Sequence, residues 1–554
     1  MSTNPTQAEV SDSSKPVNGT TTSSVQEEKS SAKASSEEQA AKETTPHDEE
    51  KPVGVRVPDD ETPAKAYDQL LSYSLIDARR LVRVGSWGMA HAADSYVVRP
   101  STVDQVEAIF DYARQHKHPV TLRGSAQSYG DPHMGQNAIL IDCTRMNRVL
   151  HWDPVEGVID VEPGVRIADI WRYTLEDGWW PPVVSGTMKP TLAGAAAMNI
   201  HGKNNYKVGT IGEYIQEFEL LTPAGERMVC SPEQNSEMFY ATIGGFGTLG
   251  FFTRLRLKMK RIHSGNVLVT AISTPTLKAM IDAFEENLDQ DYLVGWVDCT
   301  AKGMGLGRGL IHAARHLAPG EDPDPISTMR VNRQELPETL MGVVPKSAMW
   351  LGMWFSKPFW RMVNGLKYYM GIREAKAQPY LQGHAAFNFL LDYVPNWKWG
   401  YRPNGLVQYQ SFVPKDKALE VFETQIKLAQ EARLTPYLGV FKKHKPDPFL
   451  LTHAVDGYSF ALDFAATPRN RERLQSLVRS MNQLVLAAGG RFYFAKDGLL
   501  QSHEVRQVWP DEAFETFRTL KKTHDPDGIL ESDLSRRIGI FDDDFMNLGT
   551  KKTS

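Results

Sequence analysis

The fold can be worked out starting from the stretch Arg123-Gly-Ser-Ala-Gln-Ser-Tyr-Gly-Asp131 in this chain of 554 residues. A short apolar run at 119–122 precedes it and predicts a strand, and glycines at 124 and 130 enclose small or polar residues and one Tyr. Glycine lets the backbone approach a ligand closely, and successive N–H groups in such a turn can form an anion-binding nest. The loop is neither a Walker loop nor a G-x-G-x-x-G dinucleotide motif. Alone, it predicts only a turn that can hold an anion.

Two further glycine-rich segments follow this loop. The second, 185–212, contains Ser185-Gly-Thr187, the small-residue run 191–197 and His201-Gly-Lys-Asn204, and the third is 243–250. A single glycine cluster is most often a tight turn. Three of them within one typical domain length favour a large ligand with several polar groups, such as a dinucleotide.

The composition is typical of a soluble globular protein, with 41% hydrophobic and 23% charged residues. The length suits two or more domains. A net charge of −5 gives no reason to expect a nucleic-acid partner. The three cysteines lie far apart and lack the spacing of metal ligands, so we expect reduced thiols and no metal site.

Residues 1–62 are rich in Ser, Thr, Glu, Lys and Ala and contain almost no large apolar side chains. Such a segment cannot bury enough surface to offset the entropy of ordering, so we predict a disordered tail there and a short one at 546–554. No basic region followed by an apolar core begins the chain. We therefore expect no secretory signal, no transmembrane helix and a cytoplasmic location.

Short apolar runs alternate with turn residues up to about residue 263. Apolar residues recur at helical spacing over 101–116, where Ser101 or Thr102 can cap the helix. A regular βαβ rhythm is missing, which favours an α+β fold. Strands are predicted at 120–122, 138–141, 158–161, 217–221 and 251–257.

A second domain is predicted at 264–489, because this part of the chain has strands and helices of its own. The strands are expected at 266–271, 292–297, 406–412 and 459–464, and the helices at 277–287, 417–432 and 470–488.

Within that domain, 343–372 is rich in aromatic residues and Met but is interrupted by Lys346, Lys357, Arg361 and Lys367. It is too charged to span a bilayer. Its mixture of Trp, Phe and Met with Lys and Arg is typical of a segment lying on a membrane surface. A core helix or a contact between subunits is an equally good interpretation.

This part of the chain resembles the FAD domain of the vanillyl-alcohol oxidase and p-cresol methylhydroxylase flavoproteins. In chain order, the motifs that carry the resemblance are RGSAQSYGD at 123–131, SGT at 185–187, HGKN at 201–204 and the glycine-rich segment at 243–250. With FYFAKD at 492–497, the chain is more closely similar to the decaprenylphosphoryl-ribose oxidase family. The resemblance covers about residues 80–540.

This resemblance implies an α+β fold in which a two-part FAD-binding domain of the p-cresol methylhydroxylase type is joined to a substrate (cap) domain built on an antiparallel sheet. The implied bounds are 63–263 for the FAD-binding domain, 264–489 for the cap and 490–545 for a C-terminal return to the FAD domain.

The cofactor implied by the resemblance is FAD. Many members of the wider superfamily carry, at the position of Gln127, a His that bonds covalently to the flavin. An amide cannot form that bond, and no other residue of the 123–131 loop is a suitable substitute, although His133 lies just beyond the loop. We therefore expect non-covalent FAD. The residues implied to surround it are Arg123, Gly124, Ser125, Ala126, Gln127, Ser128, Tyr129, Gly130, Asp131, Gly186, Thr191, Gly194, His201, Gly202, Lys203, Asn204, Phe252 and Tyr493.

Three residues are candidates for the chemistry. Lys496 follows an aromatic run, so its ammonium can be poorly solvated and its pKa lowered, although a lysine at a strand end commonly points to solvent. The resemblance places Lys496 between flavin and substrate, as proton acceptor or stabiliser of the reduced ring. It places His201 beside the flavin as an orienting group or proton acceptor. Tyr129 can supply a phenol hydroxyl there or simply pack the turn.

On the substrate side, the resemblance implies Trp296, Gln408, Gln410, Lys442 and Lys496. Lys442 suits a phosphate, but its neighbours Lys443 and Lys445 also allow an ordinary solvated basic cluster.

One position departs from the family. Members known for covalent inhibition carry a Cys on a strand of the substrate domain, and this chain has Ala461 in the matching run 457–464. A thiol-directed inhibitor should have no target there, and the pocket is reshaped.

The function implied is oxidation of a secondary hydroxyl, the 2′-OH of a polyprenyl-phosphate-linked pentose, to a ketone, as the first half of an epimerisation. In the family, an NAD-dependent short-chain reductase takes the product. Alternatives are a sugar-lactone (aldonolactone) oxidase, which typically has the covalent His, and a flavin-dependent sterol reductase. A flavin-binding membrane assembly partner without turnover is the alternative from another class.

Overall fold

The computed structural model describes residues 74–336, 339–340, 344–345, 357–392, 397–436 and 438–548, all within the unit Val57–Ser554. The tail predicted at 1–62 lies outside these residues, as does most of the one predicted at 546–554.

The first sheet carries the strand that leads into the 123–131 loop. Its order is β1-β2-β4-β3, and β4 pairs in parallel with both β2 and β3. Helix α2 begins after Thr102, whose side chain accepts a hydrogen bond from the N–H of Gln105, and its apolar face packs on this sheet. The bounds are β1 Leu81–Gly85, β2 Ala92–Val98, α2 Val103–His116, β3 Val120–Arg123 and β4 Ile139–Asp142.

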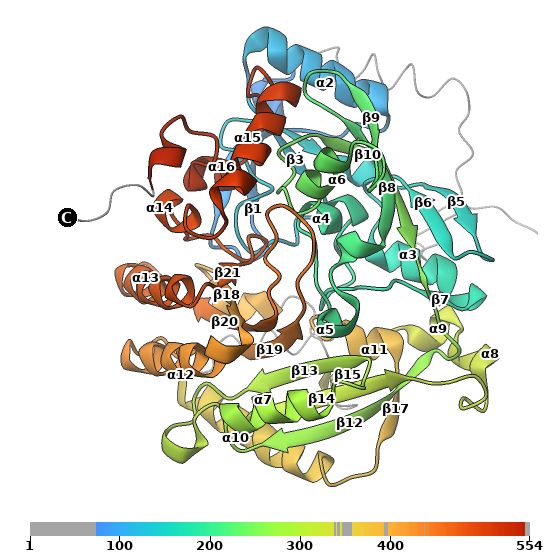
Figure 1. The fold of residues 1–554 in the computed structure, drawn as a ribbon, viewed down its shortest axis with the longest axis vertical. Helices are drawn as coiled ribbons and strands as arrows, with labels where there is room; N and C mark the ends of the chain where they lie inside the picture. Colours follow the sequence, from blue (N-terminus) through green and yellow to red (C-terminus); the bar gives the residue numbers. More distant parts are fainter. Residues whose placement is uncertain are drawn as a thin grey trace, which may run out of the picture. The chain divides into compact units, whose positions relative to one another are not determined.

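A second, antiparallel sheet has the order β5-β6-β10-β8-β9 (Figure 1). Short helices rich in small residues join its strands, and β7 and β11 form a separate pair. The strand bounds are β5 Val149–Asp153, β6 Val158–Val161, β7 Trp179–Trp180, β8 Ile215–Leu221, β9 Arg227–Cys230, β10 Phe251–Lys258 and β11 Lys260–Arg261. The helix bounds are α3 Ile167–Thr174, α4 Leu192–Ala197, α5 Asn205–Val208 and α6 Ser236–Thr242.

The third sheet has eight strands in the order β17-β12-β14-β13-β19-β20-β18-β21, with every pairing antiparallel. The antiparallel sheet expected beyond residue 263 is therefore confirmed, and the α+β class with it. The domain bounds themselves stay a prediction. The strands are β12 Asn266–Thr274, β13 Tyr292–Val297, β14 Gly309–His316, β17 Tyr380–Gly383, β18 Leu406–Pro414, β19 Gly439–His444, β20 Gly457–Ala465 and β21 Arg491–Phe492.

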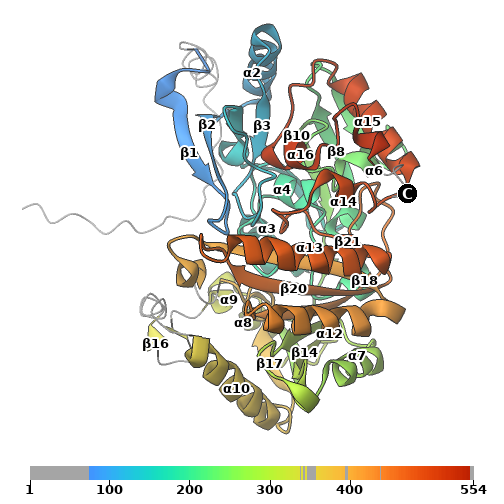
Figure 2. The ribbon, with the colours of Figure 1, turned by 90° about the vertical axis from the view of Figure 1, so that its left-hand side faces the viewer.

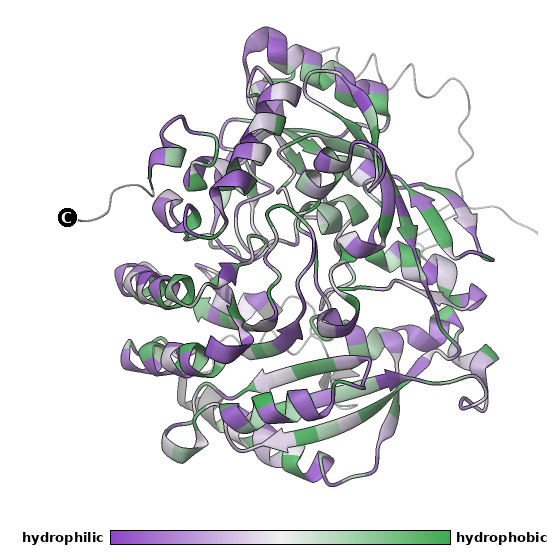
Figure 3. Ribbon diagram, viewed as in Figure 1, coloured by the Kyte–Doolittle hydropathy of each residue, from purple (hydrophilic) through white to green (hydrophobic). Residues whose placement is uncertain are grey.

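The two faces of this sheet pack against different helices, because successive side chains of a strand point to opposite sides. Phe441, Tyr458 and Phe460 point to the side covered by three amphipathic helices (Figure 2). On these helices, hydrophobic and hydrophilic residues alternate along the ribbon (Figure 3). They are α7 Leu277–Glu286, α12 Lys415–Glu431 and α13 Arg471–Ala487.

The opposite face carries α10 (Lys357–Glu374) and α11 (His384–Asn388), where Tyr368 packs on Trp296 and Phe387 packs on Tyr292. Of the segment 343–372, residues 343 and 346–356 lie outside the described part of the chain. In α10, Tyr368 is buried, whereas Met362, Leu366, Tyr369 and Met370 are exposed. Within the described residues, no helix is both long and apolar enough to cross a bilayer.

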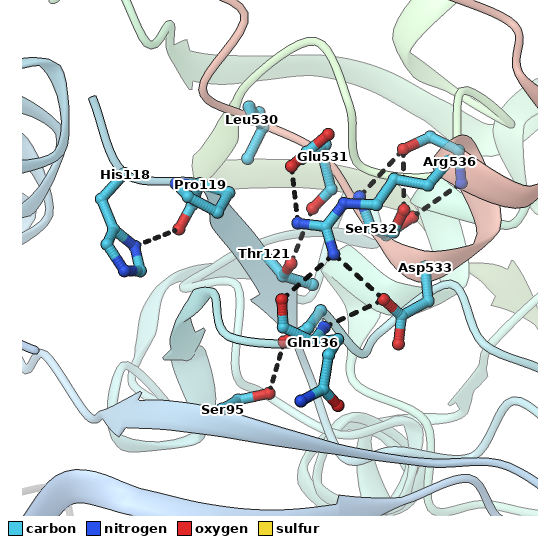
Figure 4. Close-up of polar contacts among 12 residues, drawn as sticks. Ser95, His118, Pro119, Thr121, Gln136, Leu530, Glu531, Ser532, Asp533 and Arg536 are labelled. Carbon is cyan, nitrogen blue, oxygen red and sulfur yellow. Dashed lines mark hydrogen bonds and ion pairs between the residues drawn. The ribbon is translucent and has the colours of Figure 1, made fainter. Parts of the chain in front are cut away.

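The C-terminal segment returns to the first sheet and closes over β3. The Oγ1 of Thr121 donates to the carbonyl of Glu531 at 2.6 Å, and Arg536 bonds Glu531 and Asp533 (Figure 4). Its helices are α14 Ser502–Val505, α15 Asp511–His524 and α16 Asp533–Ile538. The remaining short elements are α8 Pro325–Thr328, α9 Val331–Gln334, β15 Thr339–Leu340, β16 Val344–Pro345, η1 Ala78–Arg80, η2 Cys143–Arg145, η3 Leu175–Asp177, η4 Ile211–Tyr214, η5 Gly303–Gly305, η7 Trp397–Tyr401 and η8 Phe545–Asn547.

Arg537 on α16 joins three distant segments. Its guanidinium donates two bonds of 2.9 Å to Asp131 and forms an ion pair of 2.9 Å with Asp497. The guanidinium lowers the pKa of Asp131, although burial opposes it. The loop at 123–131, the segment containing Lys496 and the C-terminal helix are thus held by one cation.

Replacing this cation tests its importance for stability. Arg537→Gln leaves two largely buried carboxylates without a counter-charge, so we expect urea denaturation to show a loss of about 3–5 kcal/mol. The matched control is Arg536→Gln, because its ion pairs with Glu531 and Asp533 are more exposed and are expected to contribute about 1 kcal/mol or less.

The stabilisation that Arg537 gives to the folded protein should depend on pH. The pKa of Asp131 is lowered in the folded protein, so the stabilisation is present above the ordinary aspartate pKa and disappears as the pH falls through the folded value. The difference between wild type and R537Q should therefore shrink in acid. Equal losses for the two variants at pH 7 would contradict a special role for Arg537.

Candidate active site

A cavity of about 1250 Å³ lies between the glycine-rich segments and the open face of the eight-stranded sheet. Ligand pockets are usually about 300–1,000 Å³. The space is therefore sufficient for two ligands side by side, such as a cofactor and a substrate. Its wall includes 122–129, 184–201 and 246–252 on one side and side chains of β13, β14, β18, β19 and β20 on the other.

The glycines of the loop at 123–131 allow close packing between protein segments. Neither Gly124 nor Gly130 has a positive φ, and the left-handed residue is Ala126, at φ +57°. A Cβ on Gly124 would lie 2.2 Å from the Oγ1 of Thr191, and one on Gly130 would lie 1.7 Å from the carbonyl oxygen of Asp497. The glycines thus allow protein segments to meet, and this packing fixes the loop against the cavity.

Several polar atoms of residues along the cavity wall have no hydrogen-bond partner among the described residues. They include the Nη1 of Arg123, the Oε1 of Gln127 and the Nδ1 of His201, all buried. Buried polar groups are nearly always hydrogen-bonded. A guanidinium donor, an amide acceptor and an imidazole nitrogen suit a ligand with phosphate and heteroaromatic ring groups, and FAD has both.

Most residues expected to surround the cofactor do line this cavity. Four do not: Gly130 and Asp131 contact the Asp497 and Arg537 segments, Asn204 donates to the carbonyl of Pro182, and Gly202 abuts Asn204. Those that line it are Arg123, Gly124, Ser125, Ala126, Gln127, Ser128, Tyr129, Gly186, Thr191, Gly194, His201, Lys203, Phe252 and Tyr493. Lys203 also binds α11, because its Nζ donates a hydrogen bond to the backbone carbonyl of Phe387.

The floor of the cavity is made by alternate residues of neighbouring strands. Register places Trp296 beside Val440, Val440 beside Ala461, and Ala461 beside Gln410. Paired residues of an antiparallel ladder share a face. All five residues expected on the substrate side therefore reach the cavity: Trp296, Gln408, Gln410, Lys442 and Lys496.

Lys496 lies where the two walls meet. Its Nζ is 3.6 Å from the ring centroid of Tyr129, and the N–H of Tyr129 donates to the carbonyl of Ala495 at 2.8 Å. Removal from bulk water lowers the pKa of Lys496 to about 7, with the charge of Asp463 opposing the shift. Lys496 is half-buried and faces the cavity, which excludes the interpretation of a solvent-pointing lysine.

Tyr129 both packs the turn and faces the cavity. Its ring lies 4.5 Å from that of Trp87 and it is 3% exposed. Burial raises the pKa of its phenol well above the ordinary value. The hydroxyl is therefore a neutral hydrogen-bonding group.

His201 is buried among aromatic rings and two other histidines, His444 and His453. Its Nε2 lies 3.2 Å from the Nε2 of Gln410, so the amide donates and the neutral ring carries its proton on Nδ1. Burial and the nearby cation of Lys442 hold the pKa of His201 well below its ordinary range. The imidazole is therefore neutral rather than a strong base, and its Nδ1 is buried without a hydrogen-bond partner among the described residues.

Of the three neighbouring lysines, Lys442 is the one without an ion-pair partner among the described residues. Lys443 pairs with Glu285 at 2.6 Å and Lys445 pairs with Glu213 at 3.0 Å. Burial alone lowers the pKa of Lys442 to about 8.

Sequence reasoning missed several residues at the cavity. Lys367 of α10 lies 4.4 Å above the Trp296 ring, and burial lowers its pKa to about 8. The heptad-like spacing of 363, 364 and 367 on one helix face could have indicated it. Trp87, Asn364, Trp399 and Tyr401 also line the cavity, and no pattern in the sequence marks them.

Ala461 stands on the cavity floor in place of a thiol, and the one cysteine among the described residues that line the cavity is Cys143, outside the floor. The three cysteines, Cys143, Cys230 and Cys299, are buried, and burial raises the pKa of each thiol above its ordinary value.

Comparison with known proteins agrees with this geometry. The profile of the FAD binding domain family matches residues 95–231. The chain is 27% identical over 465 residues to the decaprenylphosphoryl-beta-D-ribose oxidase of Mycolicibacterium smegmatis, covering 83% of this chain and 97% of that protein. It is 20% identical over 479 residues to a putative D-arabinono-1,4-lactone oxidase of Neurospora crassa, covering 79% and 82%. A D-lactate dehydrogenase of Anaerostipes hadrus is 27% identical over 180 residues, covering 30% and 37%.

Gln127 generates a prediction about attachment of the cofactor. Since an amide is not a nucleophile, we expect acid precipitation of the purified protein to release all FAD into the supernatant, measured by its absorbance. His133, which lines the cavity just beyond the loop, is the control position. Flavin that stays in the pellet, and that His133→Ala releases, would overturn the expectation.

Proposed function

From the premise that the chain is an FAD-linked oxidase of the vanillyl-alcohol oxidase and p-cresol methylhydroxylase superfamily, we propose that it oxidises a secondary hydroxyl of a sugar to a ketone. The proposed substrate is a polyprenyl-phosphate-linked pentose, oxidised at its 2′-OH. The ketone must then be reduced to complete an epimerisation, and we expect an NAD-dependent short-chain reductase as the partner.

The observation that carries the proposal is the position of Lys496, where the loop at 123–129 meets the floor of substrate-side residues. Oxidation of a secondary alcohol removes a hydride from carbon and a proton from oxygen. FAD, when bound, supplies the acceptor for the hydride. The protein must then provide the acceptor for the proton.

Lys496 suits this task because its pKa of about 7 leaves a large neutral fraction at physiological pH. Its amine takes the hydroxyl proton and becomes an ammonium beside the Tyr129 ring. His201, neutral and held by Gln410, orients the substrate by donating from Nδ1. The apolar rings of Phe412 and Tyr493 around His201 help to exclude water.

An anionic substrate is supported by two cavity lysines. Lys442 and Lys367 both reach the cavity from the cap side, and Trp296 offers a flat surface for a sugar ring. A phosphate would suit both ammonium groups. A neutral lactone or sterol would leave Lys442 without a counter-charge, although the similarity to a putative D-arabinono-1,4-lactone oxidase keeps a lactone in the test panel.

Helix α10 supports a lipid carrier. Val363, Asn364 and Lys367 line the cavity, while Leu366 and Tyr369 are about 60% exposed on another side of the same helix. A lipid chain leaving the cavity past α10 would meet an apolar surface. We therefore propose that this helix rests on a membrane and that the protein is a peripheral membrane enzyme.

The enzymatic proposal predicts bleaching of bound FAD by a prenyl-phosphate pentose under anaerobic conditions. Lys496→Ala should slow this reduction by about 100-fold or more while FAD stays bound, because the proton acceptor is lost. In the wild type, the rate should rise with pH through about 7, since the amine must be neutral.

The matched control is Lys189→Ala, a cavity lysine that pairs with Asp392 at 3.8 Å. Its bleaching rate should stay near that of the wild type. Bleaching only by aldonolactones, free sugars or sterols would contradict the proposed substrate. Normal bleaching by the Lys496→Ala protein would contradict the role of Lys496, and an absence of bleaching by any compound would favour a binding protein without turnover.

The membrane proposal predicts flotation of the protein with anionic phospholipid vesicles. The double variant Leu366→Glu, Tyr369→Glu should lower the bound fraction by about tenfold or more, because two apolar side chains can no longer enter the interface. The control is Met304→Glu, which changes an apolar side chain that is 96% exposed on η5. Equal flotation of both variants would contradict the proposal.

A further inference from the structure

A network of buried hydrogen bonds starts on the glycine-rich segment 185–212, crosses the cavity face of the eight-stranded sheet and returns to the same segment. Its side chains are each at most 6% exposed. They are Asn205, His444, Ser459, Gln410 and His201. Ser459 pairs with Lys442 on β19 and with Phe412 on β18. His444 and Gln410 each lie two positions from these partners, so alternation turns them to the same face as Ser459.

The direction of these hydrogen bonds follows from a backbone group whose role is fixed. The N–H of Lys445 can only donate, and it reaches the Oδ1 of Asn205 at 3.4 Å. The same Oδ1 lies 2.9 Å from the Nδ1 of His444, so this nitrogen must carry a proton. Because burial holds the pKa of His444 well below its ordinary range, the ring is neutral and its Nε2 is an acceptor.

Each remaining hydrogen bond of the network then has one direction. The Oγ of Ser459 lies 2.7 Å from the Nε2 of His444, so the hydroxyl donates there. Its oxygen accepts from the Nε2 of Gln410 at 3.3 Å, and this amide nitrogen also donates to the Nε2 of His201 at 3.2 Å. The neutral ring of His201 therefore carries its proton on Nδ1.

The amide of Gln410 is thereby held with its nitrogen towards the protein. Both protons of that nitrogen are used, whereas the Oε1 accepts no hydrogen bond from the residues that the structure describes. Gln410 lines the cavity. The group that it offers to a ligand is therefore an acceptor, which suits a hydroxyl of the ligand but not a ketone, ether or ester oxygen.

We propose that His444 and Ser459 are positioning residues that determine which end of the Gln410 amide faces the cavity and which nitrogen of His201 carries the proton. Through them, the sheet side of the cavity selects a ligand that donates a hydrogen bond to Gln410. The inference rests on the proposed function only in taking that ligand to be the sugar substrate.

Replacing His444 by phenylalanine should reverse the network. The phenyl ring keeps the size of the imidazole and its ring contacts with Phe412 and His201, but it accepts no hydrogen bond in the ring plane. The hydroxyl of Ser459 is then free to donate to Gln410, whose amide turns its Oε1 towards Ser459 and His201. His201 must then carry its proton on Nε2, and the amide nitrogen of Gln410 faces the cavity.

The tautomer of His201 is measured by nitrogen NMR on FAD-loaded protein containing isotope-labelled histidine, without substrate. The signals of His201 are identified by their loss in His201→Gln. In the wild type, we expect the Nδ1–H form to exceed the Nε2–H form by about tenfold or more, and His444→Phe should invert this ratio. His444→Gln, whose amide oxygen can accept from Ser459, should keep the wild-type tautomer.

The matched control is His453→Phe. His453 is another buried histidine, with its ring centroid 5.3 Å from that of His201, and it makes no hydrogen bond to Gln410 or Ser459 within the described part of the chain. This change should leave the tautomer of His201 as in the wild type. An equal response to both phenylalanine variants, or no response to either, would overturn the inference.

Retention of FAD and an unchanged melting temperature identify variants that fold. If His444→Phe does not, Ser459→Ala serves instead, because it removes the hydroxyl that joins His444 to Gln410. The Nε2–H form of His201 should then become detectable, whereas Ser459→Thr, which keeps the hydroxyl, should behave as the wild type. A wild-type tautomer in Ser459→Ala would refute the positioning role.

Selection of a donor is tested with a prenyl-phosphate pentose and its mono-O-methyl derivatives. Half-saturating concentrations come from anaerobic bleaching or, for the 2′-O-methyl compound, from inhibition of bleaching. In the wild type, methylation of the hydroxyl that faces Gln410 should raise this concentration by about tenfold or more, because an ether oxygen cannot donate. In His444→Phe the same derivative should lose less, whereas a purely steric penalty would be equal in both proteins and would overturn the selection.

The two readouts separate this inference from the proposed function, because the tautomer is measured without substrate. An inverted tautomer ratio in a protein that no prenyl-phosphate sugar bleaches would support the positioning role of His444 and refute the proposed substrate.

Discussion

The ion triad of Arg537 with Asp131 and Asp497 is the constraint on which the site depends. It fixes the end of the cofactor loop against the segment that carries Lys496. Two contacts then act over short distances: the N–H of Tyr129 donates to the carbonyl of Ala495, and the ammonium of Lys496 lies on the Tyr129 ring. Without this triad, the loop and the lysine would belong to separate segments with no reason to share one geometry.

The eight-stranded sheet provides the substrate-side wall of the cavity, because successive side chains of a strand point to opposite faces of the sheet. Side chains at 441, 458 and 460 are apolar and lie under helices, whereas those at 440, 442, 459 and 461 face the cavity. Stability and function therefore use opposite sides of the same strands. A change on the cavity face, such as Ala461 in place of a thiol, alters the pocket without touching the core that supports it.

Local sequence patterns predicted most of the elements but not how they meet. Alternation and turn residues were sufficient for the helix α2 and for strands such as β6 and β13, whose observed bounds agree with the prediction to within two residues. The packing role of Gly124 and Gly130 could not be predicted, because only the fold shows that Thr191 and Asp497 come so close to them. The Arg537–Asp131 pair spans 406 positions, and strand register places Asp463 opposite Gln408. Neither of these two spatial contacts can be predicted from a single sequence.

The cavity lysines differ in the charged groups that act on them. Burial lowers the pKa of Lys496 and that of Lys367, and the negative charges of Asp463 and Glu374, respectively, oppose these shifts. For Lys442, burial is the cause of the lowered pKa, and no charged group in the described part of the chain opposes it. A cation kept in a low-dielectric wall without a counter-charge gains most from an anion that arrives with the ligand. Under the proposed function, Lys496 is therefore the lysine suited to exchange a proton and Lys442 the one suited to bind a phosphate.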